Sequence, residues 1–263
     1  MRLDELGELG LLAELERLGL AQGIENDAAQ IDGLVVTNDE LVEGVHFRFD
    51  LLDWRALGFR AAAVNVSDLS ASGAEPLALI VSLALPGATE LAHVVELYEG
   101  LREIGVPVRG GDTTRADSVV LSVTALGRAK RVPGRSGAQP GDLIVVTGPL
   151  GAAGAAFRNG QLRRPPVRIA EGRRLAEVAS AMLDISDGLA VDAGHIARRS
   201  SCRLEIDLDA VPLAPGATID DLSFGEDYEL LAATPDPLDF TVIGTCEEGS
   251  GVNLELAGWE HFR

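Results

Sequence analysis

The chain is poor in lysine, cysteine, aromatic side chains and long apolar runs. Lys130 is the only lysine among 22 basic residues, and the others are arginines. A Walker A loop requires a Gly-Lys-Ser/Thr sequence and a protein-kinase site requires a central lysine, so both classes of phosphate site are excluded. Cys202 and Cys246 are the only cysteines and lack the spacing of metal ligands. We therefore expect reduced thiols in a cytoplasmic protein, with no disulfide.

Membrane and nucleic-acid partners are also disfavoured by what is missing. No apolar run approaches the ~20 residues of a membrane span. The first residues, Met1–Glu5, carry acids and lack the apolar core of a secretory signal. Acidic residues number 41, and the net charge is −19. Such a surface repels nucleic acid and anionic lipid, so anionic ligands would need a local source of positive charge. Metal ions held by carboxylates supply it, and any phosphoryl chemistry here must rely on metals and arginine.

The length of 263 residues and the hydrophobic content of 46% allow one large or two medium domains. Arg128–Asp142 is rich in Gly, Pro and Arg, which is typical of a linker or a surface loop. We therefore divide the chain into residues 1–130 and 131–263. The loop also holds several basic residues that could fold over a phosphate.

Periodicity predicts an α/β (α+β) protein. Helices are predicted over Leu3–Leu20, Trp54–Ser72, Glu90–Gly105, Arg168–Ala181 and Leu189–Arg199. Strands are predicted over Leu34–Thr37, Leu77–Leu85, Ser118–Gly127, Leu143–Thr147, Arg203–Leu208, Tyr228–Thr234, Phe240–Gly244 and Val252–Leu256.

The segment Asp184-Ile185-Ser186-Asp187-Gly188-Leu189 places two carboxylates around a hydroxyl, between two predicted helices. Ser186 or Asp187 could simply cap the second helix. However, similar groupings of acids and hydroxyls recur in Thr37-Asn38-Asp39, Ser67-Asp68 and Gly110–Thr114. Each of them is predicted to end a strand or a helix. Their recurrence favours one site, assembled from several segments, with oxygen ligands for hard cations.

Several of these residues have ordinary structural explanations that the sequence leaves open. Asp27, in the polar turn Glu25–Ala29, could be only a turn residue, and His46 could be a structural histidine. The paired glycines Gly110 and Gly111 suit either a close ligand approach or a hairpin turn. Gly148–Gly154 is read as a packing turn or a phosphate cradle. The aromatic tail, Gly258–Arg263, favours docking or ligand stacking.

Asn65 and Asp68 lie within an alanine-rich helix, where polar groups must be capped, paired or metal-bound. Their surroundings complete a series of motifs that resembles the thiamine-monophosphate kinase family. That family belongs to a superfamily with aminoimidazole ribonucleotide synthetase, selenophosphate synthetase and the hydrogenase-maturation carbamoyl dehydratase. The resemblance extends over almost the whole chain, and its motifs are Asn38–Phe47, Ala63–Ala71, Gly110–Thr114, Arg135–Asp142, Asp184–Leu189 and Gly225–Leu230.

The resemblance implies that ATP phosphorylates thiamine monophosphate to thiamine diphosphate by direct transfer, with several Mg²⁺ ions. By position, the metal ligands are Asp27, Thr37, Asn38, Asp39, Asp68, Asp112, Asp184 and Asp187. ATP contacts fall on Gly111, Asp112, Arg135 and Ser186, and acceptor contacts fall on His46, Glu226 and Trp259. No residue is expected as a general base, because the nucleophile is an already anionic phosphate oxygen. The resemblance also implies a homodimer that joins the two N-terminal sheets, with ATP bound between an N-terminal metal-binding domain and a C-terminal α+β domain. Leu77–Leu85 and Ser118–Gly127 would contribute to that interface.

The chain departs from the family pattern at Asn26, where the family usually has Asp, and at Asn38, where the family often has Thr. It is also shorter around Arg158–Pro166 and Pro212–Leu222. The alternatives are another ATP-dependent enzyme of the superfamily, or a non-catalytic homologue that binds metal or nucleotide. Selenophosphate synthetase needs a reactive Cys or Sec near its N-terminus, and no cysteine precedes Cys202. The carbamoyl dehydratase needs a C-terminal cysteine, and this chain ends His261-Phe262-Arg263.

Overall fold

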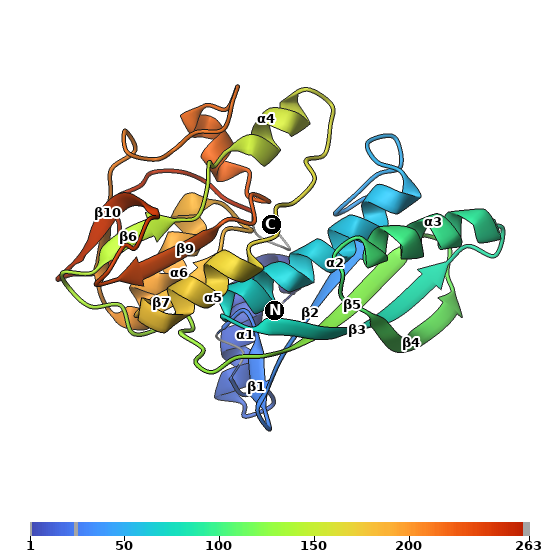
Figure 1. Ribbon diagram of the computed structural model, residues 1–263, viewed down its shortest axis with the longest axis horizontal. Coiled ribbons are helices and arrows are strands. Elements are labelled where there is room, and N and C mark those ends of the chain that lie inside the picture. Colours follow the sequence, from blue (N-terminus) through green and yellow to red (C-terminus); the bar gives the residue numbers. More distant parts are fainter. Residues whose placement is uncertain (1, 24–25, 260–263) are drawn as a thin grey trace.

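A computed structural model describes residues 2–23 and 26–259. Two mixed sheets lie toward opposite ends of the molecule, with helices between them (Figure 1). Glu25 of the predicted polar turn and the His261-Phe262-Arg263 end of the predicted tail lie outside the described residues.

The first sheet has the strand order β1-β2-β5-β3-β4. Its pairs are antiparallel except for the parallel pair of β3 and β4. One face is covered by helix α2, whose alanines allow close packing, and by α3 (Figure 1). Gly58 of α2 and Gly100 of α3 let these helices touch, because an added Cβ at either position would lie about 2 Å from a backbone oxygen of the other helix. The elements of this half are α1 (Leu3–Arg17), β1 (Ala29–Ile31), β2 (Leu34–Val42), α2 (Trp54–Ala71), β3 (Glu75–Leu85), α3 (Leu91–Arg102), β4 (Val108–Arg115) and β5 (Val120–Arg128).

The second sheet has the order β11-β8-β10-β6-β9-β7, and four of its five strand pairs are antiparallel. Helix α6 packs on it within a second hydrophobic core, and α5 lies between this sheet and α2 (Figure 1). The elements are β6 (Leu143–Val146), α4 (Ala152–Arg158), α5 (Ile169–Val178), β7 (Ala181–Asp184), α6 (Leu189–Ser200), β8 (Arg203–Ile206), the 3₁₀ helix η1 (Ile219–Ser223), β9 (Leu230–Thr234), β10 (Thr241–Glu247) and β11 (Gly251–Val252).

The predicted fold class is confirmed, whereas several local predictions were wrong. Thr37-Asn38-Asp39 and Gly110–Thr114 lie inside β2 and β4 rather than at element ends, and the hairpin-turn reading of Gly110-Gly111 fails. Hydrogen bonding to β5 continues β2 as far as Val42. The predicted helix over Arg168–Ala181 ends at Val178, and β7 follows it, because the apolar residues after Val178 pair with β9. Of the last predicted strand, Val252–Leu256, only Val252 is paired, because β11 consists of Gly251 and Val252. Strand β1 was not predicted.

Among residues 2–23 and 26–259, no helix combines the length and apolar content that crossing a bilayer requires.

Candidate functional site

A cavity of about 1220 Å³ brings together residues of both halves of the chain. Ligand sites are usually concave clefts of several hundred Å³ or more. The predicted site residues that line this cavity are Asp27, Thr37, Asn38, Asp39, His46, Asp68, Arg135, Asp184, Ser186, Asp187, Glu226 and Trp259. Twelve of the fourteen residues singled out by the sequence therefore share one cavity, although they come from eight separate stretches of chain.

Three carboxylates, which we call the aspartate cluster, lie at the centre of this arrangement: Asp27, Asp68 and Asp184. An oxygen of each lies within 4.8 Å of an oxygen of the other two. Asp27 precedes β1, Asp68 is in the last turn of α2, and Asp184 ends β7. Helix α2 packs against β7 where the two halves of the chain meet, so that Asp184 is buried and Asp27 and Asp68 are partly buried.

Burial raises the pKa of each acid in the cluster; neighbouring carboxylates raise it further at Asp68 and Asp184, whereas Arg135 opposes the rise at Asp27. The pKa of Asp184 rises to about 8, chiefly through burial and next through the charge of Asp27. The pKa of Asp68 is raised well above its usual value by burial and by the adjacent Asp39 and Asp184. Nearby Asp39 is raised to about 6, by burial and then by Asp27 and Asp187. Buried like charges are unfavourable unless a cation joins them, so this set of oxygens suits a hard divalent ion such as Mg²⁺.

Hydrogen bonds orient the acids of this region. The Thr37 hydroxyl donates to Asp68, and the Ser67 hydroxyl donates to Asp184. Asn65, which is fully buried in α2, accepts the backbone N–H of Asp39 at 3.0 Å. The polar residues of the alanine-rich helix α2 thus hydrogen-bond to residues of β2 and β7. These bonds hold the acids of the three elements near one another.

Arg135 provides positive charge beside the aspartate cluster. Its Nε and Nη2 donate to Asp27 Oδ1 at 2.9 and 2.6 Å. Its backbone N–H donates to the Asn26 side-chain oxygen at 2.9 Å. Asn26 therefore anchors the loop that carries Arg135, a task that an amide oxygen performs as well as a carboxylate.

Three of the predicted residues are placed less simply. The Asn38 side chain donates to Ser122, Val123 and Thr124 of β5. Because strand side chains alternate between faces, its amide lies opposite Thr37 and Asp39. Gly111 and Asp112 do not line the cavity; they are exposed on β4, at the far edge of the first sheet (Figure 1).

A second part of the cavity is lined by His46, Glu226 and Trp259. His46 Nδ1 accepts the Val42 backbone N–H at 3.0 Å, so the neutral ring carries its proton on Nε2. Glu226 forms an ion pair with Arg60 of α2, whose side chain is only 3% exposed. Among the described residues, the Nε of Arg60 is the one buried side-chain nitrogen or oxygen that lacks a hydrogen-bond partner.

Residues 226–229 form a segment in which each acid is paired with an arginine, and we call it the arginine-paired segment. Arg163 contacts Asp227 at 3.3 Å, and Arg168 contacts Glu229 at 2.6 Å. Glu226 and Tyr228 have left-handed backbones (φ 56° and 52°), which side chains other than glycine rarely adopt. The pairing holds this unusual conformation in place.

The contacts of Asp227 show whether Gly148–Gly154 is a packing turn or a phosphate cradle. Its carboxylate accepts the backbone N–H groups of Gly151 and Ala153 at the start of α4. These donors are the ones a phosphate would need. The turn is therefore a packing turn that binds the protein's own carboxylate.

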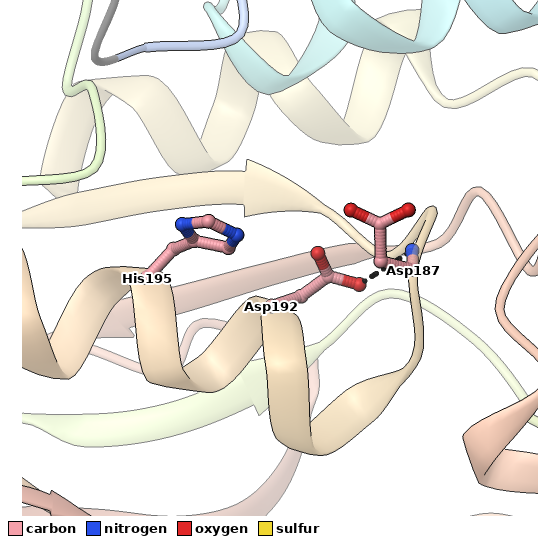
Figure 2. Close-up of side chains that lie close together, drawn as sticks. All are labelled: Asp187, Asp192 and His195. Carbon is pink, nitrogen blue, oxygen red and sulfur yellow. Dashed lines mark hydrogen bonds between the residues drawn. The ribbon is translucent and has the colours of Figure 1, made fainter. Parts of the chain in front are cut away.

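Sequence analysis missed Arg60 and Asp192. The only sequence signal for Arg60 was an arginine within an alanine-rich helix. Asp192 lies in the first turn of α6 and is 1% exposed, with its carboxylate turned back to the Asp187 backbone (Figure 2). An acid early in a helix is common, so neither residue could be singled out without the fold.

Comparison with known proteins agrees with this geometry. Residues 25–129 match the family model of the AIR synthase related protein N-terminal domain, and residues 139–254 match that of the C-terminal domain. A protein named thiamine-monophosphate kinase from Aquifex aeolicus is 34% identical, with the alignment covering 100% of both chains. A protein of the same name from Salmonella typhimurium is 35% identical over 97% of this chain and 98% of its own.

A solved structure described as AaThiL complexed with AMPPCP and TMP superposes with a TM-score of 0.91. It is 34% identical and covers 99% of both chains. Escherichia coli HypE, a hydrogenase maturation protein, has a TM-score of 0.69 at 23% identity, which shows a shared fold. Taken with the cavity and its acids, these matches show that the chain belongs to the thiamine-monophosphate kinase family of AIR-synthase-related proteins.

Proposed function

We propose that this protein transfers the γ-phosphoryl group of ATP directly to thiamine monophosphate, which yields ADP and thiamine diphosphate. The observation that carries the proposal is the joining, in one cavity, of the aspartate cluster with His46, Glu226 and Trp259. Family membership and the similarity to a structure bound to AMPPCP and TMP support it. We further propose that residues 1–130 supply most metal ligands, whereas residues 131–263 close the cavity from the other side.

The charges of the reactants explain why the site is built from acids. ATP and a phosphate monoester together bring about six negative charges at neutral pH. The attacking oxygen is already anionic, so it needs no general base; it needs reduced repulsion and alignment with the γ-phosphate. Several Mg²⁺ ions, held by the cavity's carboxylates, would neutralise the phosphate charge and so reduce this repulsion. Asp27, Asp39, Asp68, Asp184 and Asp187 fit that role by their oxygen chemistry. The pKa is raised at Asp27, Asp39, Asp68 and Asp184, chiefly by burial.

The two reactants are assigned to different walls of the cavity. Ser186 and Arg135 would contact ATP, because a hydroxyl and a guanidinium there are close to the aspartate cluster. His46 would donate to the acceptor through Nε2. Glu226 would face the cationic thiazolium or the aminopyrimidine, and the half-exposed Trp259 would stack on the thiamine rings.

A homodimer would explain the position of Gly111 and Asp112. The resemblance assigns these residues to ATP and metal, but they lie at a sheet edge away from the cavity of their own chain. The face of the first sheet opposite α2 is also left partly exposed, for example at Leu77, Ile80 and Leu126. We propose that two copies pair through this sheet and that β4 of one copy completes the cavity of the other. Size measurement in solution, together with loss of activity in Asp112→Asn, would test the pairing.

The alternatives are another ATP-dependent enzyme of the superfamily and a non-catalytic homologue. The second rests on Asn26 and Asn38, yet Asn26 retains a defined contact with the Arg135 loop. A coupled ADP assay with Mg²⁺ and ATP, comparing thiamine monophosphate, thiamine, aminoimidazole precursors and no acceptor, tests all three. ADP and thiamine diphosphate should appear only with the monophosphate. ADP with another acceptor would move the protein elsewhere in the superfamily, and folded protein that binds ATP without any turnover would favour the non-catalytic homologue.

A further inference from the structure

The side chain of Asp192 hydrogen-bonds to the backbone of the turn formed by Asp187 and Gly188. Asp192 Oδ2 accepts the backbone N–H groups of both residues, each at 3.0 Å. Figure 2 shows the Asp192 carboxylate reaching back from α6 to the Asp187 backbone. The Asp187 carboxylate takes no part in that hydrogen bond. Asp192 thus fixes the backbone of the turn and leaves the Asp187 carboxylate to face the cavity that it lines.

The same turn is joined to the acceptor side of the cavity. The Glu226 backbone N–H donates to Ser186 O at 2.8 Å, and the Trp259 backbone N–H donates to Asp187 O at 2.9 Å. Gly225 and Gly258 allow this approach, because an added Cβ would lie 2.2 Å from Ser186 O and 2.7 Å from Asp187 O, respectively. One short stretch of backbone therefore positions groups on both walls of the cavity.

Asp187, Asp192 and His195 could also be read as a further metal site, since their ligand atoms lie within 4.8 Å of one another. However, Asp192 Oδ2 already accepts two N–H groups, and His195 Nδ1 lies 2.9 Å from Arg198 Nη2. We therefore interpret Asp192 and His195 as structural residues rather than as metal ligands, with Asp192 holding the turn through its two hydrogen bonds.

We propose that Asp192 is a positioning residue for the phosphoryl transfer described above, on which this inference rests. It acts through the Asp187–Gly188 turn. By holding the turn, it sets the direction of the Asp187 carboxylate and the two carbonyls that anchor Glu226 and Trp259. Its loss should weaken Mg²⁺-nucleotide binding and acceptor binding together, whereas a simple helix cap would affect only stability.

The test compares Asp192→Ala, Asp192→Asn and a matched control, Asp53→Ala. Asp53 caps α2 by accepting the Ala56 N–H at 2.7 Å, but it is exposed and does not line the cavity. Asp192→Ala should raise both the Mg²⁺ concentration for half-maximal activity and the KM for thiamine monophosphate by about tenfold or more. Asp192→Asn should recover most of this loss, because its amide oxygen can accept the same N–H groups. Asp53→Ala should lower stability and leave both concentrations unchanged.

Calorimetric binding of AMPPCP with Mg²⁺ provides a readout without turnover, and Asp192→Ala should weaken it by a similar factor. Wild-type dependence on Mg²⁺ and acceptor in folded Asp192→Ala would overturn the inference. If that variant does not fold, hydrogen exchange of the wild type decides: AMPPCP with Mg²⁺ should slow exchange at residues 226–228, and unchanged exchange there would overturn it. Absence of thiamine diphosphate from wild-type protein would instead overturn the proposed function, while the calorimetric comparison would remain valid.

Discussion

Two groups of acids lie in or beside the cavity wall, and they differ in the side chains that they face. In the aspartate cluster, three carboxylates face one another, and Arg135 pairs with Asp27 alone. In the arginine-paired segment, Glu226, Asp227 and Glu229 each contact a different arginine. The first region carries negative charge that the protein does not balance, whereas the second is balanced internally.

We propose that this difference separates a site that receives cations from a segment that maintains shape. Removing one acid from an unbalanced cluster relieves repulsion, but removing one partner of a buried ion pair leaves an uncompensated charge. The same chemical change, carboxylate to amide, should therefore have opposite effects on stability in the two regions. The predictions below use that contrast.

The largest effect is expected for Asp68→Asn. Turnover should fall by about a thousandfold or more, because the variant removes a carboxylate at the centre of the aspartate cluster. Without Mg²⁺ its melting temperature should equal or exceed that of the wild type, since one repelling carboxyl is gone. Steady-state assays and thermal unfolding measure the two quantities, with the exposed Asp239→Asn as control. Turnover within a factor of a few of wild type would refute the metal assignment.

Glu229→Gln should act in the opposite sense. Glu229 is fully buried, accepts from Thr147 and binds Arg168 through both oxygens. Its substitution should lower the free energy of unfolding by about 2 to 3 kcal/mol, because Arg168 loses its charged partner. Asp239→Asn, which breaks the exposed pair with Arg174, should cost much less, because water screens that pair. Urea unfolding measures both, and equal costs would contradict the contrast between buried and exposed pairs.

Removal of Mg²⁺ should destabilise the wild type but have little effect on Asp68→Asn. At Mg²⁺ concentrations about a hundredfold above the dissociation constant, binding stabilises a protein by about 2.7 kcal/mol. For a chain of this size, that corresponds to a rise in melting temperature of roughly 5 to 10 °C. Thermal unfolding in EDTA and in Mg²⁺ provides the comparison. Equal rises in both proteins would show that Mg²⁺ binds elsewhere.

The smallest effect is expected for His46→Ala, which lies outside both acidic regions. The KM for thiamine monophosphate should rise several-fold, by loss of about one hydrogen bond to a charged group. The KM for ATP should remain unchanged, because the ATP contacts proposed above are Arg135 and Ser186 and do not include His46. An effect confined to ATP would assign His46 to the other reactant.

The sequence pattern predicted secondary structure well where the helix propensity of a segment agrees with its burial in the fold. Helix α2 was predicted to within one residue, because its alanines favour helix and close packing. Strand β7 was missed, because Ala181–Asp184 is too short to show a period and continues an apolar helical pattern. Residues Asn38–Val42 were not predicted as strand because they are polar in part; pairing with β5 determines their conformation.

The sequence by itself determined which residue types are available: clustered aspartates, a single lysine and a motif series that resembles one family. Tertiary structure alone decided their partners. Asp27 meets Arg135 across 108 positions, and Glu226 meets Arg60 across 166. In sequence, Asp184-Ile185-Ser186-Asp187 and Glu226-Asp227-Tyr228-Glu229 are both acidic, with two and three carboxylates in four residues. Only folding decides that the first faces other carboxylates and the second faces arginines, because the free energy of a buried charge depends on its neighbours in space rather than on its neighbours along the chain.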